Sequence, residues 1–139
     1  MTMNPKLMKI LVTALVVITI GGAVALYFVL NNSSESEAMT IDEMVDYSYT
    51  TSEMRTDLED GSFVLIQFQF VTNSKAAKAE IEKREFQVKN EFIKESVSLT
   101  TKDFKENLTN LEEHMQSVMN QKMTEGSITD VLITSKVIQ

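Results

Sequence analysis

The sequence contains no cysteine and only one histidine, which excludes much of the chemistry open to a small protein. Without cysteine there is no disulfide framework, no thiolate metal site and no cysteine nucleophile. A single imidazole, His114, cannot supply the usual pair of histidine ligands to a metal, and we expect it to be solvated. We therefore predict no metal, no cofactor and no enzymatic activity.

Positive charge, proline and glycine are also scarce. Thirteen Lys and Arg residues stand against 20 Asp and Glu, a net charge of −7, and this balance argues against nucleic-acid binding, which requires clustered cations. One proline and four glycines argue against long disordered tracts. We find no glycine-rich phosphate loop, serine-nucleophile motif or calcium-binding loop. An exported hydrolase that uses carboxylates alone is the enzymatic alternative.

The sequence does have one long apolar run, residues 10–30, with 21 residues and no charge. As a helix it would span about 31 Å, the thickness of a bilayer's hydrocarbon core. Lys6 and Lys9 precede the run and an acidic stretch follows it. Because cationic flanks stay in the cytoplasm, we predict a single-pass cell-membrane helix with residues 1–9 inside and the rest of the chain outside.

A cleaved signal peptide is the competing interpretation, because residues 23–25 form a small-x-small site. Five apolar residues follow that site, and the length of the run favours a retained anchor. Gly21, Gly22 and Ala25 are candidate helix-packing residues, since Gly21 and Ala25 form a small-xxx-small pair. Such residues are also common in membrane helices that do not pair.

An acidic, serine-rich linker is predicted over residues 31–44, between the membrane helix and a domain at residues 45–139. Residues 31–60 hold nine acids and one base. Such a stretch next to a membrane is typically a solvated spacer, although it could contact a basic partner. Its candidate contact residues are Glu35, Glu37, Asp42 and Glu43.

A hairpin is predicted next. A period of two begins near Val45, and Asp60-Gly61 then suits the positive φ angles of a two-residue turn. The second strand follows at residues 62–71. Four of its alternate side chains form one apolar face: Val64, Ile66, Phe68 and Phe70.

Residues 75–97 read as one long helix with two apolar stripes on nearly opposite sides. The first stripe consists of Ala77, Ile81, Val88 and Phe92. The second consists of Ala79, Phe86, Ile93 and Val97. The second stripe either lies between the sheet and another helix or contacts a neighbouring subunit, and both arrangements would bury it.

A second helix is predicted after a capping box at Thr100, with a continuous apolar stripe and an end at Gly126. The side chains of residues 128–138 alternate between two faces, and this pattern predicts a last strand. The order strand, turn, strand, helix, helix, strand indicates an α+β domain in layers.

The chain ends on a distinctive pattern, "GSITDV" at residues 126–131 and "VIQ" at residues 137–139. This ending, the strand pair at residues 47–71, the basic N-terminus, the single membrane helix and the Ser/Glu-rich spacer together resemble the FliL family of bacterial flagellar basal body-associated proteins. The resemblance covers essentially the full length. The helices of this chain are more acidic and richer in methionine than the family pattern.

The resemblance implies an exterior domain similar to the core domain of stomatin and prohibitin proteins. It also implies a non-enzymatic homo-oligomeric ring around the stator units MotA/MotB, close to the MS ring of the basal body and supporting torque, swimming and swarming. The stripe of Ala79, Phe86, Ile93 and Val97 is then the candidate subunit interface, and the linker faces the stator's stalk. A membrane-anchored binding module unrelated to flagella is the alternative.

Overall fold

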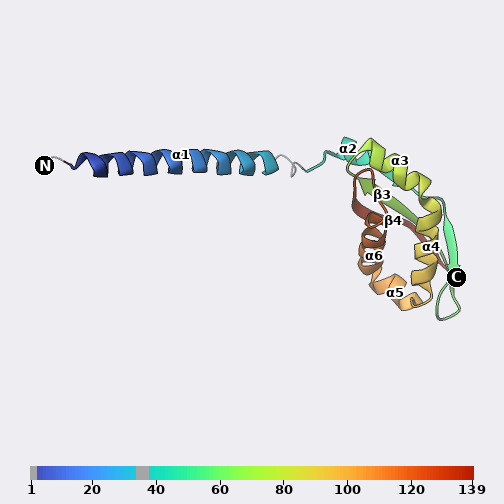
Figure 1. Ribbon diagram of the computed structural model, residues 1–139. Helices are drawn as coiled ribbons and strands as arrows, with labels where there is room; N and C mark the ends of the chain where they lie inside the picture. Colours follow the sequence, from blue (N-terminus) through green and yellow to red (C-terminus); the bar gives the residue numbers. More distant parts are fainter. Residues whose placement is uncertain (1–2, 34–37) are drawn as a thin grey trace. The chain divides into compact units, whose positions relative to one another are not determined.

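The first unit of the chain is one long helix. The computed structural model describes residues 3–33 and 38–139, and the chain divides into two compact units at residue 39. Helix α1 (Pro5–Ser33) makes up most of the described part of the first unit (Figure 1). This helix is long and apolar enough to cross a membrane, in agreement with the sequence-based expectation.

Two threonines lie inside the apolar part of α1. The hydroxyl groups of Thr13 and Thr19 each donate a hydrogen bond of 2.8 Å to a backbone carbonyl four residues earlier. A hydroxyl with a partner inside the helix is far less costly to place in lipid than an unpaired one. These two polar side chains are therefore compatible with hydrocarbon surroundings.

The second unit begins with a short helix, α2 (Ile41–Asp46), where the sequence pattern predicted the start of a strand. The strand prediction was wrong at Val45, which lies in α2 and is exposed. The reason is a capping box. The Thr40 hydroxyl accepts the Glu43 N–H, and the Glu43 carboxylate accepts the Thr40 N–H. Both N–H groups therefore have partners at this point of the chain, which stabilises the start of a helix here.

A four-stranded antiparallel sheet forms the centre of the second unit (Figure 1). Strand β3 (Phe63–Thr72) lies in its middle. β4 (Ile128–Ile138) pairs along one edge, while β1 (Ser48–Thr50) and β2 (Met54–Asp57) follow each other along the other. The bounds of β4 are those predicted. The predicted apolar face of β3 is fully buried: Val64, Ile66, Phe68 and Phe70.

The hairpin between β2 and β3 is confirmed, but its turn is longer than the two residues predicted. Gly61 has the expected positive φ, 81°. The loop is longer because Leu58 turns into the core, while its N–H donates to the Ser62 carbonyl at 2.8 Å. The Asp60 carboxylate then accepts the Ser62 N–H at 3.0 Å and closes the turn.

The helix predicted for residues 75–97 is two helices, α3 (Lys75–Lys83) and α4 (Glu85–Ser96). They meet at Arg84, whose φ of −90° and ψ of 9° depart from helical values. The first predicted stripe is buried in spite of the break, since all four of its members are fully covered: Ala77, Ile81, Val88 and Phe92.

The second predicted helix is also divided, into α5 (Thr101–Glu106) and α6 (Leu108–Asn120). Its capping box is confirmed. The Thr100 hydroxyl accepts the Asp103 N–H, and the Asp103 carboxylate accepts the Thr100 N–H at 2.8 Å. The prediction that this helix continues to Gly126 was wrong, because α6 ends at Asn120.

Asn120 ends α6 early because its side chain bridges to the start of β4. Its amide oxygen accepts the Ile128 N–H at 2.7 Å, and its amide nitrogen donates to the Ile128 carbonyl at 2.9 Å. Gly126 instead lies in the loop before β4, with a φ of 114°. A Cβ at Gly126 would lie 2.5 Å from the Asn73 side chain, so this close approach requires glycine.

The core lies between the inner face of the sheet and helices α3 to α6. Phe92 of α4 forms edge-to-face contacts with Phe68 of β3 and Phe104 of α5, with ring centroids 5.5 and 6.5 Å apart. The methionines of α6 belong to the core, because Met115 and Met119 are fully buried. This core fixes α4 against the sheet.

Candidate functional site

Helix α4 carries a stripe of apolar side chains that the described residues of the domain leave exposed. Phe86 is 71% exposed, Ile93 40% and Val97 68%. They are separated by seven and then four positions, so they share one side of the helix. With the exposed Ala79 of α3 they are the predicted interface residues, which we call the helix patch. The structure does not bury this stripe between the sheet and another helix.

A shallow groove joins the two parts of the helix patch. Its volume is about 610 Å³, and Ala79 and Phe86 both line it, although Arg84 separates α3 from α4. Its other lining residues are Ala76, Glu80, Lys83, Arg84, Thr124 and Glu125. The break between the helices therefore keeps Ala79 and Phe86 on one surface.

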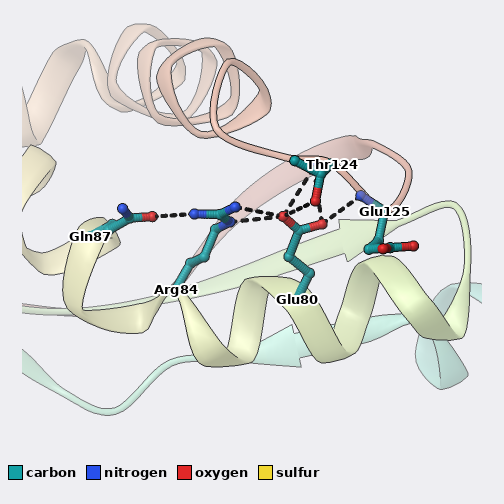
Figure 2. Close-up of polar contacts among 5 residues, drawn as sticks. All are labelled: Glu80, Arg84, Gln87, Thr124 and Glu125. Carbon is teal, nitrogen blue, oxygen red and sulfur yellow. Dashed lines mark hydrogen bonds and ion pairs between the residues drawn. The ribbon is translucent and has the colours of Figure 1, made fainter.

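Glu80 ties α3 to the loop that follows α6 (Figure 2). Its carboxylate accepts the N–H of Thr124 at 2.9 Å and that of Glu125 at 2.6 Å, and it pairs with the Arg84 guanidinium at 2.8 Å. Arg84 also donates to the Gln87 side chain at 2.8 Å. Burial opposes ionisation of Glu80, but these donors outweigh it and lower the pKa of the carboxyl to about 2.

Glu85 anchors the start of α4 to the strands. Its carboxylate accepts hydrogen bonds from the Tyr49 hydroxyl, the Ser52 hydroxyl and the Ser52 N–H. Burial, together with the neighbouring Glu85 carboxylate, raises the pKa of Tyr49 to about 12. The helix patch is thus carried by a helix whose position is fixed at its first turn.

A second apolar surface lies on the outer face of the sheet, away from the core. Phe63 is 40% and Val137 44% exposed, Leu65 is half-buried, and the Arg55 guanidinium lies 4.8 Å from the centroid of the Phe63 ring. These four residues, which we call the sheet patch, line a hollow of about 110 Å³. Sequence analysis missed this patch, although Phe63 and Leu65 sit at outward positions of the predicted strand.

The acidic linker residues are only partly within the described chain. Glu35 and Glu37 lie outside the described residues. Asp42 and Glu43 lie in the first turn of α2, where acidic side chains favour a helix start. Glu43 therefore has a structural role in the capping box as well as the predicted place in the linker.

The candidate packing residues of the membrane helix lie within α1. A Cβ built at Gly21 or Gly22 would meet nothing within 4 Å. Ala25 lies one helical turn beyond Gly21 and is exposed. The surface of α1 is therefore open at these positions.

We predicted a solvated His114, but the structure gives this side chain a partner. Its Nε2 lies 3.1 Å from a carboxylate oxygen of Glu95, which links α6 to α4. Glu112 of α6 accepts the Ile133 N–H at 2.9 Å and covers part of the free edge of β4. In the described part of the chain, no three His, Asp or Glu side chains gather as a metal site would require.

The groove beside the helix patch contains two carboxylates, Glu80 and Glu125. A hydrolase built on carboxylates needs one of them protonated at neutral pH, with a raised pKa. The pKa of Glu80 is shifted the other way, and its oxygens are occupied by donors. The Glu125 side chain points away from Glu80 (Figure 2). Glu80 therefore does not supply a general acid, and the two carboxylates do not face each other.

Comparison with known proteins gives two consistent matches. Residues 48–139 match the family described as flagellar basal body-associated protein FliL. The chain is also 35% identical over 115 residues to a protein of Bacillus subtilis (strain 168) named flagellar protein FliL, covering 80% of this chain and 82% of that protein. The matched region contains the whole sheet, both patches and helices α3 to α6. The chain therefore belongs to the FliL family of flagellar basal body-associated proteins.

Proposed function

We propose that this protein is a membrane-anchored scaffold that assembles with copies of itself around the stator units MotA/MotB and supports torque, swimming and swarming. Family membership supports the flagellar role. The observation that carries the self-assembly is the helix patch, in which Phe86 and Val97 stay more than two-thirds exposed on a rigid helix. Exposed apolar surface of this kind marks an interaction site.

The proposed anchor is α1, retained as a single-pass helix with the N-terminus in the cytoplasm. Its charge-free run and the bases Lys6 and Lys9 before it support this orientation. Gly21, Gly22 and Ala25 are the proposed contacts between neighbouring membrane helices, since small residues let helix backbones approach closely.

The orientation can be measured with reporters fused to the C-terminus. Because the second unit follows the apolar run, alkaline phosphatase fused after Gln139 is expected to be active, and a fluorescent protein that matures only in the cytoplasm is expected to stay dark. The same two reporters fused after Lys9 serve as the matched control and should show the opposite pattern. A fluorescent C-terminal fusion would overturn the proposed orientation.

The acidic linker is proposed to face the stator, through Glu35, Glu37, Asp42 and Glu43. These four acids, with no Lys or Arg in residues 31–44, suit a basic partner surface. Contacts with the MS ring and a fold likeness to the core domain of stomatin and prohibitin proteins are further parts of this proposal, which the family resemblance implies.

The proposed mechanism is mechanical and uses no catalysis. A membrane helix confines each copy to the plane of the membrane, which raises the effective concentration of its domain for self-association. A closed assembly would then favour one conformation of the stator segment that it surrounds. The filled core and the ionised Glu80 of the groove are consistent with a scaffold.

Motility of a deletion strain tests this function. The strain is expected to spread less in soft agar than its parent, because its stators lack the scaffold, and the full chain should restore spreading. A version without residues 10–30 should not, since its domain loses the confinement that drives assembly. A wild-type spreading rate in the deletion strain, or complete restoration by the version without the helix, would contradict the proposal.

A further inference from the structure

The second unit carries two apolar surfaces that differ in shape, and they lie on different layers of the domain. In the helix patch the Phe86 ring is 71% exposed at the side of the shallow groove that it lines with Ala79. The sheet patch is a smaller hollow, with a volume of about 110 Å³ between Arg55, Phe63, Leu65 and Val137. An exposed ring on one surface and a small hollow on the other can join two copies front to back.

The hollow has the size of one aromatic ring. An engineered cavity of about 150 Å³ in another protein admits benzene, and a hollow of about 110 Å³ that is open on one side is comparable. The Arg55 guanidinium already lies over the Phe63 ring at 4.8 Å, so a second ring placed in the hollow would meet the same cation. Phe86 is a protruding side chain of this shape.

Charged side chains of both signs flank the two patches, because Arg55 belongs to the sheet patch and the exposed Glu82 lies four residues before Phe86, but each patch also has a pair of charges opposite in sign to a pair at the other. Exposed Lys83 and Lys89 lie three residues before and after Phe86. Beside the sheet patch, Asp57 pairs with Phe63 across the strands, and Glu59 follows it in the turn. None of these four charged side chains is in a salt bridge within the described residues. Lys89 lies close enough to Glu85 to favour its charged form, and the other three have no such neighbour among these pairs, so all four can take part in pairing between copies.

We infer that the sheet patch of one copy receives Phe86 of the next, with Lys83 and Lys89 opposite Asp57 and Glu59. This inference rests on the proposed self-assembly and names the surface that completes it. Because the two patches differ, the contact is heterologous, and each copy has one protruding and one receiving side. A chain of such contacts continues until it closes on itself, which a contact between two helix patches would not do.

Cysteine cross-linking tests this pairing without background from native thiols of this protein, since the chain has no cysteine of its own. The variants are D57C and K89C, in the full chain in its native membrane, because these positions flank the patches and leave Phe63 and Phe86 in place. When the two variants carry different tags and are co-expressed, a short thiol cross-linker should give a dimer that contains both tags. The double variant D57C/K89C should give a ladder of products.

Each outcome of this experiment separates the inference from the proposed function. N110C replaces K89C as the matched control, since Asn110 is exposed on α6 outside both patches, and it should give no mixed dimer. A homodimer from K89C alone would mean that helix patches meet each other, which overturns the inference. A missing mixed dimer overturns it as well, and an amine-reactive cross-linker then shows whether wild-type oligomers exist. If they do not, the proposed self-assembly also fails.

Discussion

Replacing both Phe86 and Ile93 with Glu is expected to abolish self-association and to leave the domain folded. The two side chains are 71% and 40% exposed, so their removal takes little from the core. In an assembly, however, each new carboxylate would be buried against an apolar surface, and an unpaired buried charge costs several kcal/mol. A loss of about 4 kcal/mol weakens association about a thousandfold.

The measurement is cross-linking of the full-length double variant in membranes, with circular dichroism of the purified protein to show that it is folded. The matched control is Ile41→Glu with Val45→Glu on α2, where the side chains are 72% and 62% exposed. That control has the same two new charges outside both patches, and its oligomers should persist. Unchanged oligomers in the Phe86→Glu/Ile93→Glu variant would show that the helix patch is not the interface.

Strands β3 and β4 could be predicted to within a residue at each end because their pattern is local, whereas the single strand predicted from Val45 is helix α2 followed by the short strands β1 and β2. Alternation in β3 separates Val64 and Ile66 from Leu65 and Gln67, and burial follows the same separation in the structure. The inner stripe of α3 and α4 was predictable for the same reason, since periodicity reports which side of an element is buried.

The ends and breaks of helices depended on contacts that periodicity does not contain. The break at Arg84 adjoins Glu80, whose partners Thr124 and Glu125 lie 44 and 45 residues away. The early end of α6 depends on the Asn120 side chain and the start of β4. Such tertiary contacts override local propensity, and a single sequence does not report them.

The two patches show the same limit at the candidate site. The stripe that forms the helix patch could be predicted from its periodicity, but the sequence left open whether another helix of the domain covers it. The sheet patch could not, because its exposure depends on which face of β3 the helices cover. Phe63 and Leu65 would be buried in a domain with helices on both faces, and here they are exposed and half-buried.

Replacing Glu80 with Ala is expected to lower the free energy of unfolding by about 3 kcal/mol. The substitution removes the carboxylate that accepts several charge-assisted hydrogen bonds, and the groups that donate these bonds lose their acceptor. The Glu80 side chain is only 9% exposed, and the N–H groups of Thr124 and Glu125 and the Arg84 guanidinium all depend on it. The measurement is urea denaturation at pH 7. Glu82→Ala, an exposed acid two residues away on α3, is the matched control and should change the free energy by less than about 0.5 kcal/mol.

The pH dependence of the Glu80→Gln variant separates the charge of this carboxylate from its shape. The pKa of Glu80 falls from 4.5 to about 2 on folding, so the folded state holds fewer protons than the unfolded state between these values. The stabilisation by the charge is therefore complete above pH 4.5 and is lost as the pH falls toward 2. The wild-type protein should lose stability more steeply than Glu80→Gln across this window, and the two curves should converge at its acid end. If stability fell equally with pH in both proteins, the negative charge of Glu80 would contribute nothing to stability. The hydrogen bonds of Figure 2 would then not be charge-assisted.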